Sequence, residues 1–106
     1  MQRLSAILLF ISLACSAKVA LADNEQLKTL LQRNNCSACH MIDKRKYGPT
    51  LKEVAAKYAG DPAAVNKLAA KIKAGGTGVW GEDIMPPQSI SKADAKTVAE
   101  LILALE

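Results

Sequence analysis

The 106-residue sequence is poor in several residue types that build common sites and cores. It has one histidine, one tryptophan, one phenylalanine, two tyrosines and three cysteines. A single histidine excludes any site in which one chain supplies two imidazoles. The only long apolar run, residues 4–14, is shorter than the roughly 20 residues that span a bilayer. Convincing alternation with period two is also missing, which indicates an all-α domain.

The N-terminus has the pattern of a secretory signal peptide. A positive start at Arg3 precedes the apolar run, and small residues lead to an A-x-A-like site at 20–22. We therefore expect residues 1–22 to be cleaved and residues 23–106 to form one domain in the bacterial periplasm. A retained membrane anchor is one alternative. A lipid-linked Cys15 is another, although Ser12 stands where lipoprotein signals have leucine.

Removal of such a signal peptide changes the charge and the cysteine content of the chain. The signal peptide contains Arg3 and Lys18, so its removal lowers the formal net charge from +4 to about +2. A net charge this close to zero does not indicate nucleic-acid binding. Cys15 leaves too, so two cysteines remain. The remaining aliphatic core is thin for an independent domain, and we expect a further group to hold the fold together.

Four segments have helical periodicity. The first spans residues 24–33. The second begins at Thr50, where Thr50 and Glu53 form a capping-box pattern, and stops near residue 60. The third has Asp61 as its predicted N-cap and Pro62 at its first helical position, and ends at residues 75–76. The fourth begins at Ser91 and is predicted to bury Val98, Leu101, Ile102 and Leu105. Residues 41–49 and 75–89 are loops by composition.

The segment from Cys36 to His40 reads C-S-A-C-H, the attachment pattern of c-type haem. Two cysteines three apart at the end of a helix project to one side, so both sulfurs reach the vinyl groups of one porphyrin. His40 then lies under the iron and ligates it. We therefore predict covalent attachment through Cys36 and Cys39.

Three other interpretations of this segment are open. A thioredoxin-like redox pair belongs with a βαβ unit, which the sequence does not indicate. A structural zinc site needs four ligands, and the mature chain offers two cysteines and one histidine. A plain disulfide leaves the lone histidine and the thin core unexplained.

The second axial position has three candidates: a methionine, an exchangeable water, or no ligand. Met41 is adjacent to His40 and cannot easily reach the opposite face of the ring. Met85 lies in the long loop before two prolines, which stiffen the backbone there. Methionine is also a common gap filler in cores. Given a haem, ligation by Met85 is favoured, because His/Met coordination recurs in electron carriers.

The mature chain resembles the short class I cytochromes c of bacteria, of the cytochrome c-551/c-552 type. The resemblance depends on residues 35–40, Gly48-Pro49, residues 54–59, residues 78–81 and residues 85–87. It implies about four helices wrapped around one haem c, with the N- and C-terminal helices crossing. It also implies a carrier of single electrons rather than an enzyme, with Met85 opposite His40.

The resemblance further implies roles for residues around the haem. Pro49 is expected to accept a hydrogen bond from the ring of His40, which tunes the ligand. Trp80 is expected to donate to a haem propionate. Lys71 stands where relatives often have an arginine near the propionates, and lysine supplies only a point charge there.

The expected partners are transient redox proteins: a membrane oxidoreductase as donor and a terminal reductase or oxidase, such as nitrite reductase, as acceptor. The basic run Lys44, Arg45 and Lys46 is either a docking patch or a solvated loop. A monomer is expected. The alternative functions are a five-coordinate haem enzyme or gas sensor, and a haem subunit of a larger oxidoreductase.

Overall fold

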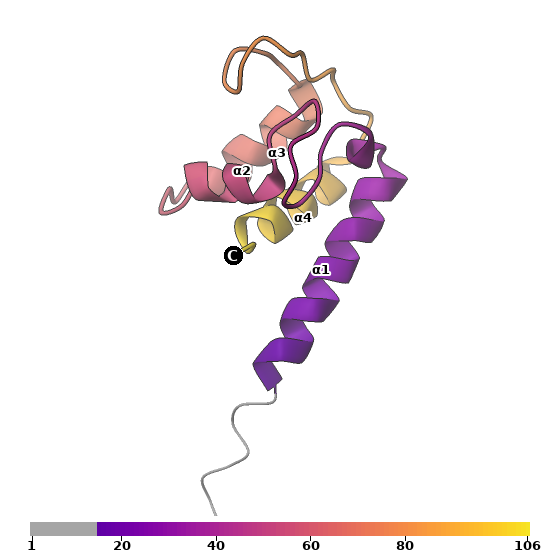
Figure 1. Ribbon diagram of the computed structural model, residues 1–106, viewed down its shortest axis with the longest axis vertical. Helices are drawn as coiled ribbons and strands as arrows, with labels where there is room; N and C mark the ends of the chain where they lie inside the picture. Colours follow the sequence, from indigo (N-terminus) through magenta and orange to yellow (C-terminus); the bar gives the residue numbers. More distant parts are fainter. Residues whose placement is uncertain (1–14) are drawn as a thin grey trace, which may run out of the picture.

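The computed structural model describes the backbone of residues 15–106 and the side chains of residues 24–106 (Figure 1). Its helices are α1 (Cys15–Arg33), the 3₁₀ turn η1 (Cys36–Ala38), α2 (Leu51–Lys57), α3 (Ala64–Ala74) and α4 (Lys92–Leu103). Within residues 15–106 the only strand-like pairing is a single bridge between Gly76 and Met85. The prediction of an all-α domain is confirmed.

Helix α1 is longer than predicted at its start. It begins at Cys15 rather than near Asn24, because residues 15–33 contain no proline or glycine to interrupt it. Its end at Arg33 agrees with the prediction. There Asn35 adopts a left-handed conformation with φ 59°. The predicted cleavage point after Ala22 lies on this helix, and residues 1–14 of the predicted signal peptide lie outside the described residues.

The predicted starts of the second and fourth helices are confirmed. The Thr50 hydroxyl accepts from the Glu53 backbone N–H, and the Glu53 carboxylate accepts from the Thr50 N–H, which completes the capping box of α2. The Ser91 hydroxyl accepts from the Asp94 N–H at the start of α4. Each cap satisfies helix N–H groups that have no partner within the helix.

The predicted start of the third helix was wrong. Asp61 is not its N-cap and Pro62 is not its first residue, because α3 begins at Ala64 with Ala63 in the cap position. The Asp61 carboxylate instead accepts from the Ala63 N–H at 2.8 Å, and the Asp61 carbonyl accepts from the Ala64 N–H at 3.1 Å. These local bonds close a tight turn ahead of the helix.

Helix α4 is central to the packing, since α1, α2 and α3 all contact it. The predicted contact between the first and last helices is therefore present. Val98 and Ile102 are buried as predicted, but Leu101 and Leu105 are only half-buried. Leu101 lies about 100° around the helix from Ile102 and is therefore off the buried face. Leu105 lies beyond Leu103, the last residue of α4. Ala95 and Ala99 fill the buried face instead.

Candidate functional site

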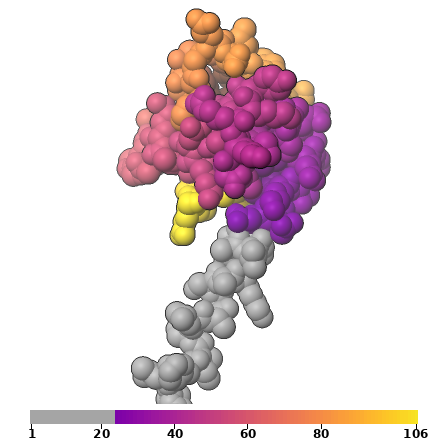
Figure 2. All heavy atoms as spheres, in the orientation of Figure 1, coloured from indigo at the N-terminus to yellow at the C-terminus, as the bar shows by residue number. Residues whose placement is uncertain are grey.

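A cavity of about 350 Å³ lies between the helices and the two long loops. In Figure 2 the surface is hollowed between the orange part of the chain, near residue 80, and the magenta part, near residue 40. Aliphatic side chains from all four helices line it: Leu31, Leu51, Val54, Leu68, Ile72, Val98 and Ile102. The cavity has the size and the apolar lining of a site for a small organic molecule.

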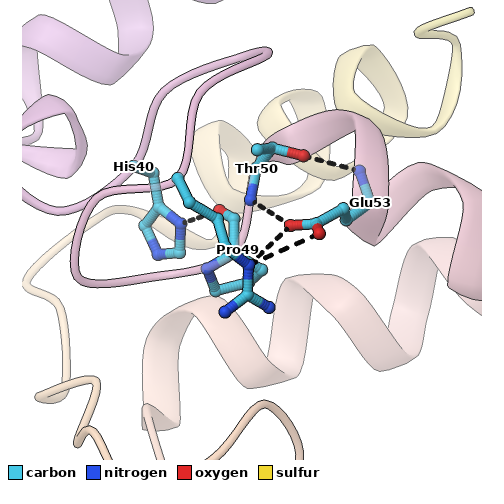
Figure 3. Close-up of polar contacts among 5 residues, drawn as sticks. His40, Pro49, Thr50 and Glu53 are labelled. Atoms are coloured by element: carbon cyan, nitrogen blue, oxygen red, sulfur yellow. Dashed lines mark hydrogen bonds and ion pairs between the residues drawn. The ribbon is translucent and has the colours of Figure 1, made fainter.

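His40 enters this cavity from the loop after η1. Its Nδ1 lies 3.0 Å from the carbonyl oxygen of Pro49, as Figure 3 shows. A carbonyl only accepts, so Nδ1 is the donor, and in the neutral imidazole Nε2 carries the lone pair. Gly48 lies directly against the ring, since a Cβ at this position would be 2.7 Å from His40 Nδ1. The imidazole is thus held in one orientation and one tautomer.

The capping box of α2 is continuous with this hydrogen bond. The Thr50 N–H donates to Glu53 Oε2 at 2.8 Å, and the Glu53 N–H donates to Thr50 Oγ1 at 3.0 Å (Figure 3). The Arg45 Nε lies 3.4 Å from the same carboxylate. The hydrogen bond from the Thr50 backbone, with the Arg45 charge as a smaller cause, lowers the pKa of Glu53. Glu53 is therefore a carboxylate at neutral pH.

Cys36 and Cys39 both line the cavity and are not joined to each other by a disulfide. Burial raises the pKa of the Cys36 thiol. The 3₁₀ turn brings the two residues and His40 onto one short segment, with the His40 N–H bonded to the Cys36 carbonyl at 2.9 Å. Among residues 24–106 no group of three cysteine, histidine or acidic side chains is placed to hold a metal ion.

Met85 lies in the loop between α3 and α4 and also lines the cavity. Its backbone N–H donates to the Gly76 carbonyl and its carbonyl accepts from the Gly76 N–H, each at 2.9 Å. Gly75, at the end of α3, has φ 67°, and a Cβ there would collide with the Met85 carbonyl oxygen. The loop is thereby closed at its base, and Met85 and His40 line one cavity from two different segments.

The other predicted site residues are divided. Pro49, Trp80 and Lys71 all line the cavity. The basic run does not line the cavity. Within it, Arg45 is paired with Glu53, and Lys44 and Lys46 are exposed.

Four residues of the site were not assigned a role from the sequence. Tyr47 and Ile84 line the mouth of the cavity while 69% and 75% exposed. Lys57 Nζ lies 5.4 Å from the centre of the Trp80 ring. Glu53 was identified only as a helix cap. Glu53 is also connected to His40 through the Pro49–Thr50 peptide unit. The one sequence signal for this connection was that the capping box starts immediately after Pro49.

The residues that line this cavity suit a haem. Cys36 and Cys39 stand on one turn beside His40, and Met85 lines the cavity from the opposite loop. Imidazole and thioether are axial ligands of haem iron, and thiols three residues apart attach haem covalently. The apolar lining suits a porphyrin. A small all-α domain with this chemistry is a c-type haem protein.

The comparisons with known proteins identify the family. Residues 25–106 match the family described as Cytochrome c, and the chain belongs to it. Its cofactor is therefore one covalently bound haem c, and its class is that of the electron-transfer proteins rather than the enzymes.

Individual relatives agree with this assignment. The chain is 53% identical over 74 residues to cytochrome c-551 of Azotobacter vinelandii, over 70% of this chain and 90% of the relative. It is 50% identical over 78 residues to cytochrome c-552 of Nitrosomonas europaea, over 73% of this chain and 76% of the relative. The crystal structure of wild-type Nitrosomonas europaea cytochrome c552 matches with a TM-score of 0.73 and 49% identity, over 74% of this chain and 99% of that one. The predicted resemblance is confirmed.

Hydropathy gives one further finding about the described helices. None of them is long and apolar enough to cross a membrane.

Proposed function

We propose that this chain is a periplasmic carrier of single electrons, with haem c attached through Cys36 and Cys39 and ligated by His40 and Met85. The observation that supports this most directly is that the oriented His40 imidazole and Met85 line one apolar cavity from two different segments. When bound, the haem supplies an iron that changes its charge by one electron.

The residues of the chain set the conditions for that exchange. Pro49 fixes the His40 ring so that Nε2 is the ligand atom. The Gly76–Met85 bridge holds the opposite loop closed. With His40 and Met85 both holding the iron, the chain would leave no open position for oxygen or small substrates. Trp80 supplies an indole N–H and Lys71 a positive charge for the propionates.

Docking to redox partners is proposed at the mouth of this cavity. The exposed Tyr47 is there, and the exposed Lys44 and Lys46 precede it in the same loop. Charges of this kind raise association rates with acidic partners and weaken with salt, which suits brief encounters. The donor is a membrane oxidoreductase, and the acceptor is a terminal reductase or oxidase such as nitrite reductase. The carrier acts as a monomer.

Export is proposed from the signal-like N-terminus, with cleavage after Ala22. The test is expression of the full chain in a bacterium that matures c-type haem, followed by fractionation and a potentiometric titration of the purified protein. The expected result is a haem-carrying chain in the periplasmic fraction, starting at Asp23, that titrates reversibly as a one-electron couple. Retention in the cytoplasm or membrane contradicts the proposed location, and irreversible oxidation contradicts the proposed role.

A further inference from the structure

The Pro49–Thr50 peptide unit is hydrogen-bonded at both ends. Its carbonyl oxygen accepts from His40 Nδ1 at 3.0 Å, and its N–H donates to Glu53 Oε2 at 2.8 Å (Figure 3). A carboxylate, a peptide group and an imidazole thus form one uninterrupted series of hydrogen bonds. The series runs from the first turn of α2 into the cavity.

A peptide group transmits charge between its two ends because its bonds are in resonance. A carboxylate that accepts from the N–H draws the proton outward and leaves more negative charge on the carbonyl oxygen. Consecutive hydrogen bonds strengthen one another in this way, by about 10–30% for each bond. The Pro49 oxygen is therefore a stronger acceptor for His40 than an ordinary carbonyl.

We propose that Glu53 is a positioning residue that sets the donor strength of His40 through the Pro49–Thr50 peptide unit. The proposal rests on the proposed function, because it takes Nε2 of His40 as the iron ligand. A metal-bound histidine whose other ring nitrogen donates to a carboxylate is oriented and made more basic by it. Here a peptide group stands between the carboxylate and the ring. The more basic imidazole favours the oxidised iron and lowers the reduction potential.

Arg45 opposes this effect. Its Nε lies 3.4 Å from both carboxylate oxygens of Glu53, so its positive charge withdraws electron density from the start of the series. Both side chains remain substantially exposed, which leaves the ion pair sensitive to salt. Removal of Arg45 is therefore expected to act in the opposite direction to removal of the Glu53 charge.

Helix capping alone does not need a charged residue at position 53. Glutamine is also a capping-box residue at this position, since its carbonyl oxygen accepts from the N-cap N–H. The substitution Glu53→Gln therefore keeps the geometry of the cap and removes the charge. This separates a structural role of Glu53 in α2 from a role in tuning His40.

The experiment compares four variants in the haem-loaded protein: Glu53→Gln, Arg45→Gln, Asp83→Asn and Ser91→Ala. Asp83→Asn removes a carboxylate that lines the cavity but is not part of the series. Ser91→Ala removes the cap of a different helix, α4, and Ser91 is not part of the series. For each variant the reduction potential is measured, together with the proton resonance of His40 Nδ1–H in the reduced protein.

The expected result is that Glu53→Gln raises the potential and moves the Nδ1–H resonance upfield. Arg45→Gln lowers the potential and moves the resonance downfield. Asp83→Asn raises the potential without moving the resonance, and Ser91→Ala lowers stability and moves neither quantity. The inference is overturned if Glu53→Gln moves the resonance no further than Asp83→Asn does. If Glu53→Gln does not fold, an unmoved resonance in Arg45→Gln overturns it equally. The absence of any ligated-imidazole resonance in the unsubstituted protein refutes the proposed function instead.

Discussion

Gly76 and Met85 exchange both of their backbone hydrogen bonds, and each N–H donates to the other residue's carbonyl oxygen at 2.9 Å. The two residues are nine positions apart, and the hydrogen bonds between them close the loop that lines the cavity together with His40. Because the pairing involves only backbone atoms, the position of the loop does not depend on the Met85 side chain. The identity of that side chain can therefore be changed without opening the loop.

Met85→Ala is expected to leave the fold intact and to open the iron to exogenous ligands. The reduced variant should bind carbon monoxide, and the oxidised variant should lose the weak far-red methionine-to-iron band. Met41→Ala is the matched control, because Met41 is 42% exposed and adjacent to His40. Coordination that is unchanged in Met85→Ala refutes Met85 as a ligand.

Gly75→Ala is expected to destabilise the protein by on the order of 3 kcal/mol. Gly75 has φ 67°, which disfavours any side chain, and the added Cβ would collide with the backbone of Met85 and Pro86. Gly60→Ala is the control, since Gly60 has φ 78° but no atom within 4 Å of the added Cβ. That variant should lose only about 1 kcal/mol. Equal losses in denaturant unfolding would mean that the contact at Gly75 is unimportant.

The sequence predicted those parts of the fold that depend on neighbouring residues. The caps at Thr50 and Ser91 were predictable because each side chain bonds to a backbone three positions ahead. The predicted start of α3 was wrong because the Asp61 carboxylate accepts a hydrogen bond from the backbone N–H of Ala63, two positions ahead. Local patterns do not reveal which of two local hydrogen bonds the backbone adopts.

The candidate site was predictable where residue type and spacing carry the chemistry, as in the segment from Cys36 to His40. The closure of the loop by Gly76 was not predictable, because it depends on how two residues nine positions apart within a fifteen-residue loop meet. The contact of Arg45 with Glu53 was missed for the same reason, since it joins a loop to a helix. Those contacts depend on the tertiary arrangement.

The effect of pH on stability should depend on Glu53. The hydrogen bond from Thr50 holds the pKa of this carboxyl below its ordinary value of 4.5 in the folded protein. The unfolded chain therefore takes up a proton at higher pH than the folded chain. The contribution of Glu53 is complete above the unfolded-state pKa and is lost as the pH falls through the folded-state pKa.

Glu53→Gln removes this contribution, so the difference in unfolding free energy between the unsubstituted protein and the variant should shrink below about pH 4.5. Denaturant unfolding at a series of pH values measures it. Asp61→Asn is a positive control, because the hydrogen bond from Lys67 lowers the pKa of Asp61 too. A difference for Glu53→Gln that is the same at every pH argues against the folded-state hydrogen bond.

Replacement of Cys36 and Cys39 together by alanine is expected to abolish covalent attachment of haem. Acid–acetone extraction should then remove all haem from the double variant and none from the unsubstituted protein. Cys15→Ala is the control, because we place Cys15 in the cleaved segment. Haem that stays with the double variant after extraction counts against attachment at these two residues.

The visible spectrum of the exported protein shows whether His40 and Met85 together ligate the haem iron. The spectrum is recorded for the oxidised protein, then for the reduced protein, and then after addition of carbon monoxide. Ligation by both residues predicts sharp low-spin bands on reduction, a weak far-red band when oxidised, and no change with carbon monoxide. A high-spin spectrum that shifts with carbon monoxide contradicts it and indicates a five-coordinate haem enzyme or gas sensor.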